Sequence, residues 1–384
     1  MDFELNEEQR DIQQAARSFA AGEFDKEKIL EWEQDHTFPR EIWKKACKLG
    51  FVGIHYPEEY GGQGYGVFEN ILIVEEFCRR DSGVGIALSL ADFSSEIILH
   101  FGTADQKKKV LIPVAKGESI SAGAYTEPDH GSDITNLSTT AARRDGAFVI
   151  NGTKTFITNG SIADFYVVLC QTDPHAAPPY RGQCTLLVEK GTKGLEATEI
   201  MPKMGIRLTS TAELSFSDVS VPASHLIGEE NKGFYQVLQF FDESRIEIAA
   251  QALGIAQGAF DRALDYTKQR EQFGRKLTDF QITRHKLADM ATKIETARLL
   301  TYQAAWNFDL KRIDPKLTSM AKMFAARTAV EVADEAIQLH GGYGYITEYE
   351  VERFYRDAKI TEIYEGTREI QKNVIASALI GKSK

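Results

Sequence analysis

The chain has 384 residues, of which 43% are hydrophobic and 26% charged, a composition typical of a globular protein with two or three domains. Its formal net charge is −11 and it has no long basic run, which argues against nucleic acid or an anionic membrane surface as the main partner. The first twenty residues lack the pattern of a signal peptide, and no apolar run approaches the ~20 residues that cross a bilayer, so we expect a cytoplasmic protein without a membrane span.

The four cysteines and eight histidines show no spacing typical of a metal site. The cysteines are scattered without a CxxC pair, and the histidines form no HExxH motif. We therefore expect reduced cysteines that pack in the interior, and no bound metal.

Residues 1–121 are predicted to form an N-terminal helical domain. Asn6, followed three residues later by Gln9, is typical of a capping box at the start of a first helix. A second helix is predicted to end at Gly50, and the proline and glycines of residues 56–64 predict a loop. Further helices are predicted over residues 71–79 and 94–101.

Residues 122–228 are predicted to form a small antiparallel β-domain between two helical blocks. Asn151-Gly152 lies between two runs of strand-forming residues, which predicts a two-residue hairpin turn joining strands over 148–150 and 153–158. Further strands are predicted over residues 164–172, 183–189 and 213–221.

Residues 229–384 are predicted to form a C-terminal helical bundle, which makes the chain an α+β multidomain protein. Small and apolar residues recur at spacings of three and four over 246–267 and 287–308, as in bundle seams. A third helix is predicted over 316–339, and a fourth helix is predicted to carry Glu365 to the C-terminus. These seams suit close packing within or between subunits, and a monomeric bundle is the alternative.

Glu365 and Gly366 form the strongest candidate for a catalytic pair. A glycine inside a helix costs about 1 kcal/mol relative to alanine, so Gly366 needs a reason other than helix formation. Its missing side chain would let a ligand approach the backbone beside the Glu365 carboxylate. We interpret Glu365 as a general base at the edge of a pocket; the alternative is a solvated carboxylate beside a helix kink.

Two further segments are candidates for cofactor binding. Phe156 and Thr158 are two residues apart on a predicted strand, so they share a face that would suit a flat heteroaromatic ring, unless they are ordinary sheet residues. Arg270 and Arg275 flank Phe273-Gly274 at a helix end, where arginine could hold a diphosphate, unless both are solvated. No glycine-rich Rossmann motif or P-loop occurs, so neither that mode of dinucleotide binding nor phosphoryl transfer is supported.

Five segments taken together resemble the acyl-CoA dehydrogenase family, in the family's order and over nearly the whole chain. They are residues 125–133, 151–160, 270–274, 338–344 and 356–367. The resemblance implies an N-terminal helical domain, a middle β-domain and a C-terminal four-helix bundle, usually assembled as a homotetramer with FAD at a subunit interface. It also implies an acyl-CoA substrate and an electron-transfer flavoprotein as the electron acceptor.

The resemblance also implies roles for individual residues. Glu365 matches the base that removes the proton alpha to the thioester while the beta hydride goes to flavin N5, forming a 2-enoyl-CoA. The residues matched to FAD are Tyr125, Thr126, Phe156 and Thr158 around the ring, Arg270, Phe273, Gln281, Gln338, Gly341 and Gly342 on the dinucleotide of a neighbouring subunit, and Thr367 and Glu369 in a further flavin segment. The residues matched to the substrate are Ser132, Asp242, Arg245, Tyr364 and Gly366.

The chemistry accounts for a buried carboxylate. The alpha proton of a thioester is too weakly acidic for a carboxylate in water, so the base must be partly desolvated and the enolate stabilised. We therefore expect burial to raise the pKa of Glu365 toward neutrality.

Two positions depart from the common pattern of the family. Some subfamilies carry the base where this chain has Ser244; the neighbouring Glu243 is turned away by about 100° on a helix, so we keep Glu365 as the base. Asp92 lies in a loop that borders the acyl pocket in this family and usually carries a neutral residue there. An acid here resembles the anaerobic dehydrogenases of alicyclic acyl-CoAs, which makes Asp92 a possible second base; the alternative is a surface or helix-capping aspartate.

The substrate predicted on these grounds is a short or medium, branched or alicyclic acyl-CoA, such as cyclohexanecarboxyl-CoA. An acyl-CoA oxidase and an enoyl-CoA reductase on the same scaffold are alternatives. A non-catalytic helical scaffold is the alternative from a different class.

Overall fold

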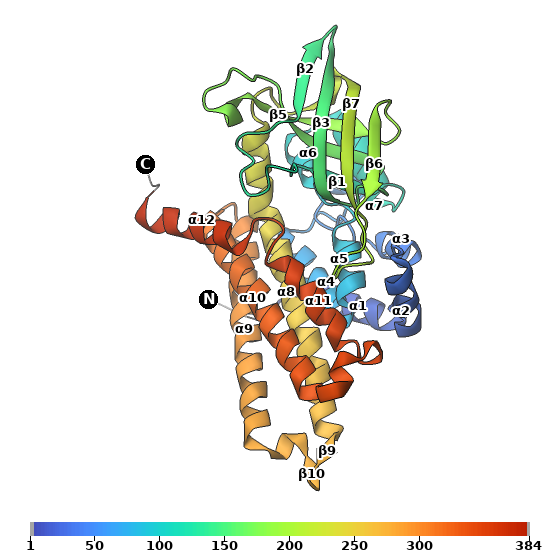
Figure 1. Cartoon of the computed structure of the whole chain (residues 1–384), viewed down its shortest axis with the longest axis vertical. Coiled ribbons are helices and arrows are strands. Elements are labelled where there is room, and N and C mark those ends of the chain that lie inside the picture. Colours follow the sequence, from blue (N-terminus) through green and yellow to red (C-terminus); the bar gives the residue numbers. More distant parts are fainter. Residues whose placement is uncertain (1–3, 382–384) are drawn as a thin grey trace.

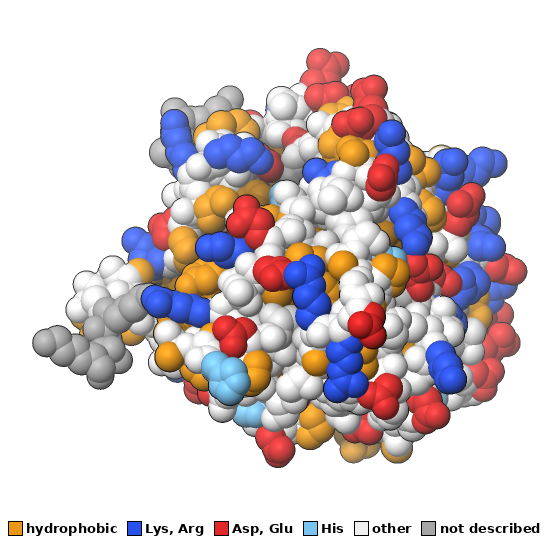
Figure 2. All heavy atoms as spheres, turned by 90° about the horizontal axis from the view of Figure 1, so that it is seen from above, with side chains coloured by type: hydrophobic (Ala, Val, Ile, Leu, Met, Phe, Trp, Pro, Cys, Tyr) orange, Lys and Arg blue, Asp and Glu red, His pale blue; other side chains and the backbone are white. Residues whose placement is uncertain are grey.

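The computed structural model describes residues 4–381 and places a β-sheet at one end of a long helical bundle (Figure 1). The N-terminal helices within residues 7–89 pack beside the bundle, beneath the sheet, whereas those within residues 95–115 lie against the sheet. Seen from the sheet end, acidic and basic side chains are interspersed over the surface (Figure 2). In the described part of the chain, no helix is long and apolar enough to cross a bilayer.

The N-terminal part is helical, as predicted. Its first helix begins at the expected capping box, in which Asn6 and Gln9 exchange side-chain hydrogen bonds with each other's backbone. The helix predicted from residue 71 begins four residues earlier, at Val67. The helices are α1 (Glu7–Glu23), α2 (Lys26–Asp35), α3 (Arg40–Lys48), α4 (Val67–Arg80), α5 (Ser82–Ser89), α6 (Ser95–Phe101) and α7 (Ala104–Ala115).

The middle part forms one sheet with the strand order β6-β7-β3-β2-β4-β5-β8, and β1 pairs with β4. The pairing is antiparallel except where β1 and the start of β2 run parallel to β4. The strands are β1 (Ser121–Ala124), β2 (Thr140–Arg144), β3 (Ala147–Thr158), β4 (Phe165–Gln171), β5 (Gln183–Glu189), β6 (Leu195–Glu199), β7 (Thr211–Pro222) and β8 (Leu226–Ile227).

The predicted hairpin turn at Asn151-Gly152 is wrong. Strand β3 runs straight through these residues and pairs with β7 on both sides of them, with a shift of register at Gly152. The turn lies instead at Asp145-Gly146, where both residues have positive φ (48° and 78°), as a two-residue turn of this kind requires. The β-bulge at this register shift requires glycine at position 152, because a Cβ there would lie 2.6 Å from the Cα of Thr139.

The C-terminal part is the predicted bundle. Its helices are α8 (Gly233–Gln269), α9 (Gln281–Asp309), α10 (Pro315–His340), α11 (Val351–Thr361) and α12 (Arg368–Ile380), and the short strands β9 (Glu271–Gln272) and β10 (Arg275–Lys276) join α8 to α9. The small and apolar seam residues of α8, α9 and α10 form one buried core with α4. The four cysteines are buried and unpaired, as expected.

Helix α8 approaches α4 very closely. A Cβ at Gly254 would lie 2.4 Å from the carbonyl oxygen of Glu75, and one at Gly258 would lie 2.2 Å from that of Arg79. Glycine is therefore needed at both positions for the two backbones to meet.

The prediction that a single helix carries Glu365 to the C-terminus is wrong. Helix α11 ends at Thr361 and α12 begins at Arg368, so Glu365 and Gly366 lie in a break between two helices. Both have left-handed backbone, with φ of 54° and 92°. Gly366 is therefore explained by the conformation of this break.

Candidate active site

The loop between α11 and α12 is held by side chains from three other positions in the bundle. Lys322 on α10 donates a hydrogen bond from Nζ to the Gly366 carbonyl (2.7 Å). Gln371 on α12 donates from Nε2 to the carbonyls of Glu365 (3.0 Å) and Gly366 (2.9 Å). Arg245 on α8 has Nε 3.4 Å from the Glu365 carbonyl. These contacts support a left-handed conformation that costs a residue other than glycine about 1 kcal/mol or more.

The carboxylate of Glu365 has one hydrogen-bond donor, the hydroxyl of Ser244, whose Oγ lies 2.6 Å from Oε2. Burial raises the pKa of Glu365 above its usual value, which is the direction expected of the base. The hydrogen bond from Ser244 and the charges of Arg245 and Lys322 oppose part of that rise. Glu365 is therefore set in place but keeps a higher proton affinity than a solvated carboxylate.

The buried charges of Lys322 and Arg245 act on this carboxylate, and Arg245 in turn lies near Asp242. Burial lowers the pKa of Lys322 to about 7, although the Glu365 carboxylate opposes the shift. Arg245 is buried, lies over the ring of Phe241 at 5.5 Å and is 3.8 Å from the carboxylate of Asp242. Burial raises the pKa of Asp242 to about 6, against the nearby Arg245 charge.

Sequence reasoning did not identify Lys322 or Gln371 as parts of this site. Lys322 lies on the buried face of α10 with Ser319 and Ala326, at the spacing of a helix seam. A lysine at a seam position is unusual in a core, and this feature of the sequence could have identified Lys322 as part of the site. Gln371 gave no signal, because its role depends on the break before α12.

The residues predicted around a flavin ring meet at the end of β3. The Thr155 N–H donates to the carbonyl of Thr126 (2.9 Å), which brings the segment before β2 next to Phe156. A bulge gives Phe156 a φ of 56° and leaves its side chain 67% exposed, on the side away from the buried Thr155 and Ile157. Thr158 lies two residues further on and is half-buried, as the shared face predicted.

The neighbouring Tyr125 is a core residue. Its ring is buried, and its hydroxyl donates to Ser94 Oγ at 2.7 Å. Ser132, by contrast, is exposed in the loop between β1 and β2.

The second predicted group of cofactor residues lies at the opposite end of the bundle, near β9 and β10 (Figure 1). The Arg270 guanidinium lies 5.6 Å from the centre of the Tyr343 ring, which joins the end of α8 to the segment after α10. Phe273 is 93% exposed. The other members, all exposed, are Gln281, Gln338, Gly341 and Gly342.

The second group is also far from the Glu365 loop. Arg245, which contacts that loop, and Arg270 are 25 residues apart along α8, which corresponds to about 38 Å of helix. Each group by itself fits part of FAD. The exposed Phe156 with its threonines suits a flat ring system, and Arg270 beside an exposed Phe273 suits a diphosphate and a second ring.

The remaining predicted residues lie beside the Glu365 loop. Thr367 caps α12 by accepting a hydrogen bond from the Ile370 N–H (3.4 Å), and Glu369 is exposed in the first turn of that helix. The Tyr364 hydroxyl donates to the Gln251 side chain on α8. All three residues therefore lie close to the base in the sequence, and none of them contacts its carboxylate.

Asp92 is buried, so the expectation that it could be a surface aspartate is wrong. The Tyr56 hydroxyl donates to its carboxylate at 3.3 Å. Burial and the Glu96 carboxylate raise its pKa to about 7, although the positive charge of His55 opposes the shift.

Glu243 does not reach Glu365, in agreement with the prediction from helix geometry. Its carboxylate accepts or shares a hydrogen bond with His100 Nε2 at 2.7 Å, whereas Ser244 contacts Glu365. A small cavity lies next to Ser244, and its lining consists of His55, Val67, Asn70, Phe93, Glu96, Phe240, Glu243, Ser244 and Glu247. Asp92 is not part of this lining.

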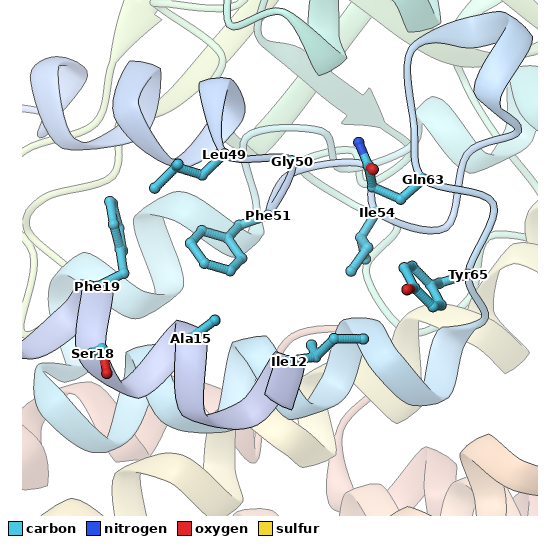
Figure 3. A pocket seen from close by; sticks show the side chains of 10 residues that line it. All are labelled: Ile12, Ala15, Ser18, Phe19, Leu49, Gly50, Phe51, Ile54, Gln63 and Tyr65. Carbon is cyan, nitrogen blue, oxygen red and sulfur yellow. The ribbon is translucent and has the colours of Figure 1, made fainter. Parts of the chain in front are cut away.

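A larger hollow of about 560 Å³ lies on the N-terminal helices, between α1 and the residues after α3 (Figure 3). Apolar side chains dominate it. Its lining consists of Ile12, Ala15, Ser18, Phe19, Leu49, Gly50, Phe51, Ile54, Gln63 and Tyr65, and it includes none of the predicted site residues.

Comparison with known families gives three matches that together cover most of the chain. The N-terminal domain of acyl-CoA dehydrogenases matches residues 6–118, the middle domain 122–219 and the C-terminal domain 231–380. These three parts coincide with the helices, the sheet and the bundle of the structure.

Among proteins of known name, a short-chain specific acyl-CoA dehydrogenase of Clostridium acetobutylicum is 44% identical over 99% of this chain and 100% of its own. A caffeyl-CoA reductase-Etf complex subunit, CarC, of Acetobacterium woodii is 39% identical over 98% of this chain and 100% of its own.

Two solved structures share the fold. The butyryl-CoA dehydrogenase of Megasphaera elsdenii has a TM-score of 0.95 at 40% identity, covering 99% of this chain and 100% of that one. A glutaryl-CoA dehydrogenase from Mycobacterium smegmatis in complex with FADH2 has a TM-score of 0.93 at 32% identity, covering 99% and 96%. The chain belongs to the acyl-CoA dehydrogenase family, whose members are FAD-dependent oxidoreductases that form enoyl-CoA from acyl-CoA.

Proposed function

We propose that Glu365 is the base of an acyl-CoA dehydrogenase reaction that converts an acyl-CoA to a 2-enoyl-CoA. One observation carries this proposal: the Glu365 carboxylate has a raised pKa and lies on a left-handed loop whose carbonyls are held by Lys322 and Gln371. A group with this proton affinity and a fixed position suits proton abstraction from carbon.

In the proposed reaction, Glu365 takes the alpha proton of the thioester through its free carboxylate oxygen. Ser244 keeps the other oxygen in place by its 2.6 Å hydrogen bond. FAD, when bound, supplies the acceptor for the beta hydride. Gly366 allows the left-handed backbone of the loop beside the base, where a Cβ would lie 2.7 Å from Gln371 Nε2, and Arg245 orients the loop from α8.

We further propose that two copies of the chain complete each cofactor site. The residues of the β3 end, with Thr367 and Glu369, would face the flavin, while Arg270, Phe273, Gln281, Gln338, Gly341 and Gly342 would hold the rest of FAD from a neighbouring subunit of a homotetramer. The distance of about 38 Å along α8 between Arg270 and Arg245, which contacts the Glu365 loop, supports a contribution from a second chain. The CoA chain would pass the loop at Ser132.

For the substrate, we propose a short or medium acyl-CoA, including branched and alicyclic acids such as cyclohexanecarboxyl-CoA. The names of relatives favour short chains, and the buried Asp92 motivates the alicyclic class. If Asp92 is a second base, Asp92→Asn should lower turnover of cyclic substrates more than that of linear ones. Equal turnover of both substrate classes in the variant and the wild type would refute that role.

An enoyl-CoA reductase is the second candidate, because the name of the CarC relative describes a reductase. The same name mentions Etf, and we propose that an electron-transfer flavoprotein exchanges electrons with this enzyme as well. A reduced enzyme that passes electrons to a 2-enoyl-CoA faster than an acyl-CoA reduces the oxidised enzyme would favour the reductase. Rapid oxidation of the reduced flavin by oxygen would instead indicate an oxidase.

The test is an anaerobic titration of the yellow holoenzyme with linear, branched and alicyclic acyl-CoAs, followed by its visible spectrum. We expect at least one class to bleach the flavin, and Glu365→Gln to bind the same acyl-CoA without bleaching. A flavin that no acyl-CoA reduces would contradict the proposed direction of reaction. Bleaching that persists in Glu365→Gln would contradict the role of Glu365.

A further inference from the structure

The small cavity next to Ser244 has an unusual lining for a site that handles acyl groups. Phe93 and Phe240 pack edge to face at 5.1 Å and, with Val67, form an apolar part of the wall. The rest is polar and includes His55 and Glu96. The cavity leaves about 10 Å³ for the centre of a water-sized group. The cavity therefore accommodates the end group of an acyl chain and not a whole chain.

The cavity lies one side chain away from the proposed base. Ser244 contributes to its lining and donates its hydrogen bond to Glu365. An acyl chain whose alpha carbon is at Glu365 can therefore direct its far end past Ser244 into this cavity.

His55 and Glu96 have polar atoms without partners at this cavity. Both side chains are 94% buried, with an exposed fraction of 6%. Their closest contact, His55 Nε2 to Glu96 Oε1, is an ion-pair distance of 3.6 Å. Among the described residues, no hydrogen-bond partner exists for either ring nitrogen of His55 or for Glu96 Oε2. A buried polar group without a partner is costly, so the pair is suited to a ligand that supplies one.

The other ionisable groups at the cavity are already engaged or neutral. Glu243 is bonded to His100, and this contact lowers its pKa against the effect of burial. Burial and four neighbouring carboxylates raise the pKa of Glu247 well above its usual value, which favours its uncharged form. Burial alone would lower the pKa of His55, but the carboxylates of Glu96, Glu243 and Asp92 raise it to about 9, so both of its ring nitrogens carry protons at neutral pH.

The pair therefore offers two donors, the N–H groups of His55, and one free acceptor, Glu96 Oε2. A hydroxyl group both donates and accepts, so it satisfies Glu96 Oε2 and one His55 nitrogen at once. A methyl group satisfies neither. A carboxylate would only accept and would lie next to Glu96 and Glu243, and an ammonium group would only donate and would lie next to the His55 cation.

We propose that the His55–Glu96 pair forms a subsite for a hydroxyl group at the far end of the acyl chain, and that the enzyme prefers hydroxyl-ended acyl-CoAs over their methyl-ended counterparts. This inference rests on the proposed dehydrogenase function and extends it to a substrate class. The hydroxyl would donate to Glu96 Oε2 and accept from His55 Nδ1, and it would take no part in the oxidation.

The test compares kcat/KM for butyryl-, pentanoyl- and hexanoyl-CoA with that for the same chains ending in hydroxyl, carboxylate or ammonium, and for cyclohexanecarboxyl-CoA with its 4-hydroxy derivative. A hydrogen bond to a charged partner corresponds to about 10-fold or more, so we expect at least one hydroxyl-ended member to be preferred by about that factor. The carboxylate-ended chain should be the poorest of its set.

Two variants test whether this preference comes from the pair. Glu96→Gln keeps the shape but removes the charged acceptor, and His55→Phe keeps a ring against Tyr56, which His55 contacts at 4.8 Å, but removes the donor. Each should reduce the hydroxyl preference to about 2-fold or less, mainly through KM. Glu58→Gln, an exposed glutamate three residues from His55, is the matched control and should keep the full preference.

Equal kcat/KM for hydroxyl- and methyl-ended chains at every length would overturn the inference and leave the dehydrogenase function intact, because the methyl-ended chains would still be oxidised. A preference for the carboxylate- or ammonium-ended chain, or a hydroxyl preference retained in both variants with bound FAD, would overturn it as well. If no acyl-CoA of any kind reduces the flavin, the proposed function itself fails.

Discussion

The two ends of α8 differ in how complete their sites are. Near Arg245, the Glu365 loop is held by side chains of α8, α10 and α12, which bond to one oxygen of the Glu365 carboxylate and to the carbonyls of Glu365 and Gly366. Near Arg270, Phe273 and Tyr345 are 93% and 85% exposed. Contacts within a single chain organise the Arg245 end of α8, whereas the Arg270 end exposes aromatic rings and an arginine. On the proposed function, the first end prepares catalysis within a chain and the second end holds FAD for a neighbouring copy.

The largest effect is expected at the organised end. Glu365→Gln removes the base but can keep the hydrogen bond from Ser244, so kcat should fall by about 10²- to 10⁴-fold, with FAD and acyl-CoA still bound. Stopped-flow flavin reduction measures the rate, and the flavin spectrum checks occupancy. A variant that keeps more than a tenth of the wild-type rate would contradict the assignment of the base.

A mixing experiment tests directly whether the Glu365 end and the Arg270 end of one site come from different chains. Arg270→Ala should weaken FAD binding, and Glu365→Gln should abolish turnover, so each variant alone is nearly inactive. If each site combines the Glu365 end of one chain with the Arg270 end of another, co-expression of the two variants restores one intact site in mixed pairs. Random pairing then gives about a quarter of the wild-type activity per site, by the closed symmetry of such interfaces.

Activity that stays at the level of the single variants would show that both ends serve the same chain or that Arg270 has no role in FAD binding. Co-expression of Glu365→Gln with itself under a second tag is the control for restored activity.

A smaller effect is expected when the Glu365 loop loses one of the hydrogen bonds that hold it. Lys322→Met removes the hydrogen bond to the Gly366 carbonyl while keeping most of the side-chain volume. Since misplacement of a catalytic group is costly, kcat should fall by about 10-fold with little change in KM. Lys322→Arg, which keeps a donor and the charge, should recover part of this loss. Lys372→Met, at an exposed lysine of α12, tests whether any loss of a lysine near the loop has the same effect.

The smallest effect is a shift in pH dependence. Glu365 acts only when ionised, and burial raises its pKa, so kcat/KM should increase with pH until the carboxyl group has lost its proton. The Ser244 hydroxyl stabilises the ionised form and lowers this pKa. Ser244→Ala should therefore move the acidic limb to higher pH by up to about one unit. A limb that stays in place or moves to lower pH would contradict this role of Ser244.

The sequence was sufficient for the parts of the fold that depend on local periodicity. The seams of α8, α9 and α10, the capping box at Asn6 and strands β3, β4, β5 and β7 all follow from residues close together in the chain, whereas the short strands β1, β2, β6 and β8 were not predicted. The Asn151-Gly152 turn failed because pairing with β7 continues through it, and Asp145-Gly146 supplies the turn. Long-range strand pairing thus overrode a local turn preference.

The site was predictable where a residue type itself implies chemistry. Glu365 beside Gly366 was identified correctly as an unusual pair, although the helix break that explains the glycine was not. Lys322, Gln371, His55 and Glu96 were missed because their roles arise only when distant segments meet. Lys322 is 44 positions from its partner Gly366, Gln371 is 6 positions from Glu365, and His55 is 41 positions from Glu96.

The close contact of α8 with α4 at Gly254 and Gly258 has a consequence for how this enzyme can vary. Because the two backbones touch at two successive turns, α8 cannot slide or rotate without a steric clash with α4. If FAD is bound as proposed, the length of α8 fixes the spacing between the Glu365 loop of one chain and the Arg270 end that contacts a neighbouring subunit. A one-residue insertion beyond Gly258 would then turn the Arg270 end by about 100° and disturb the site of that neighbour, while the chain's own Glu365 loop stays unchanged.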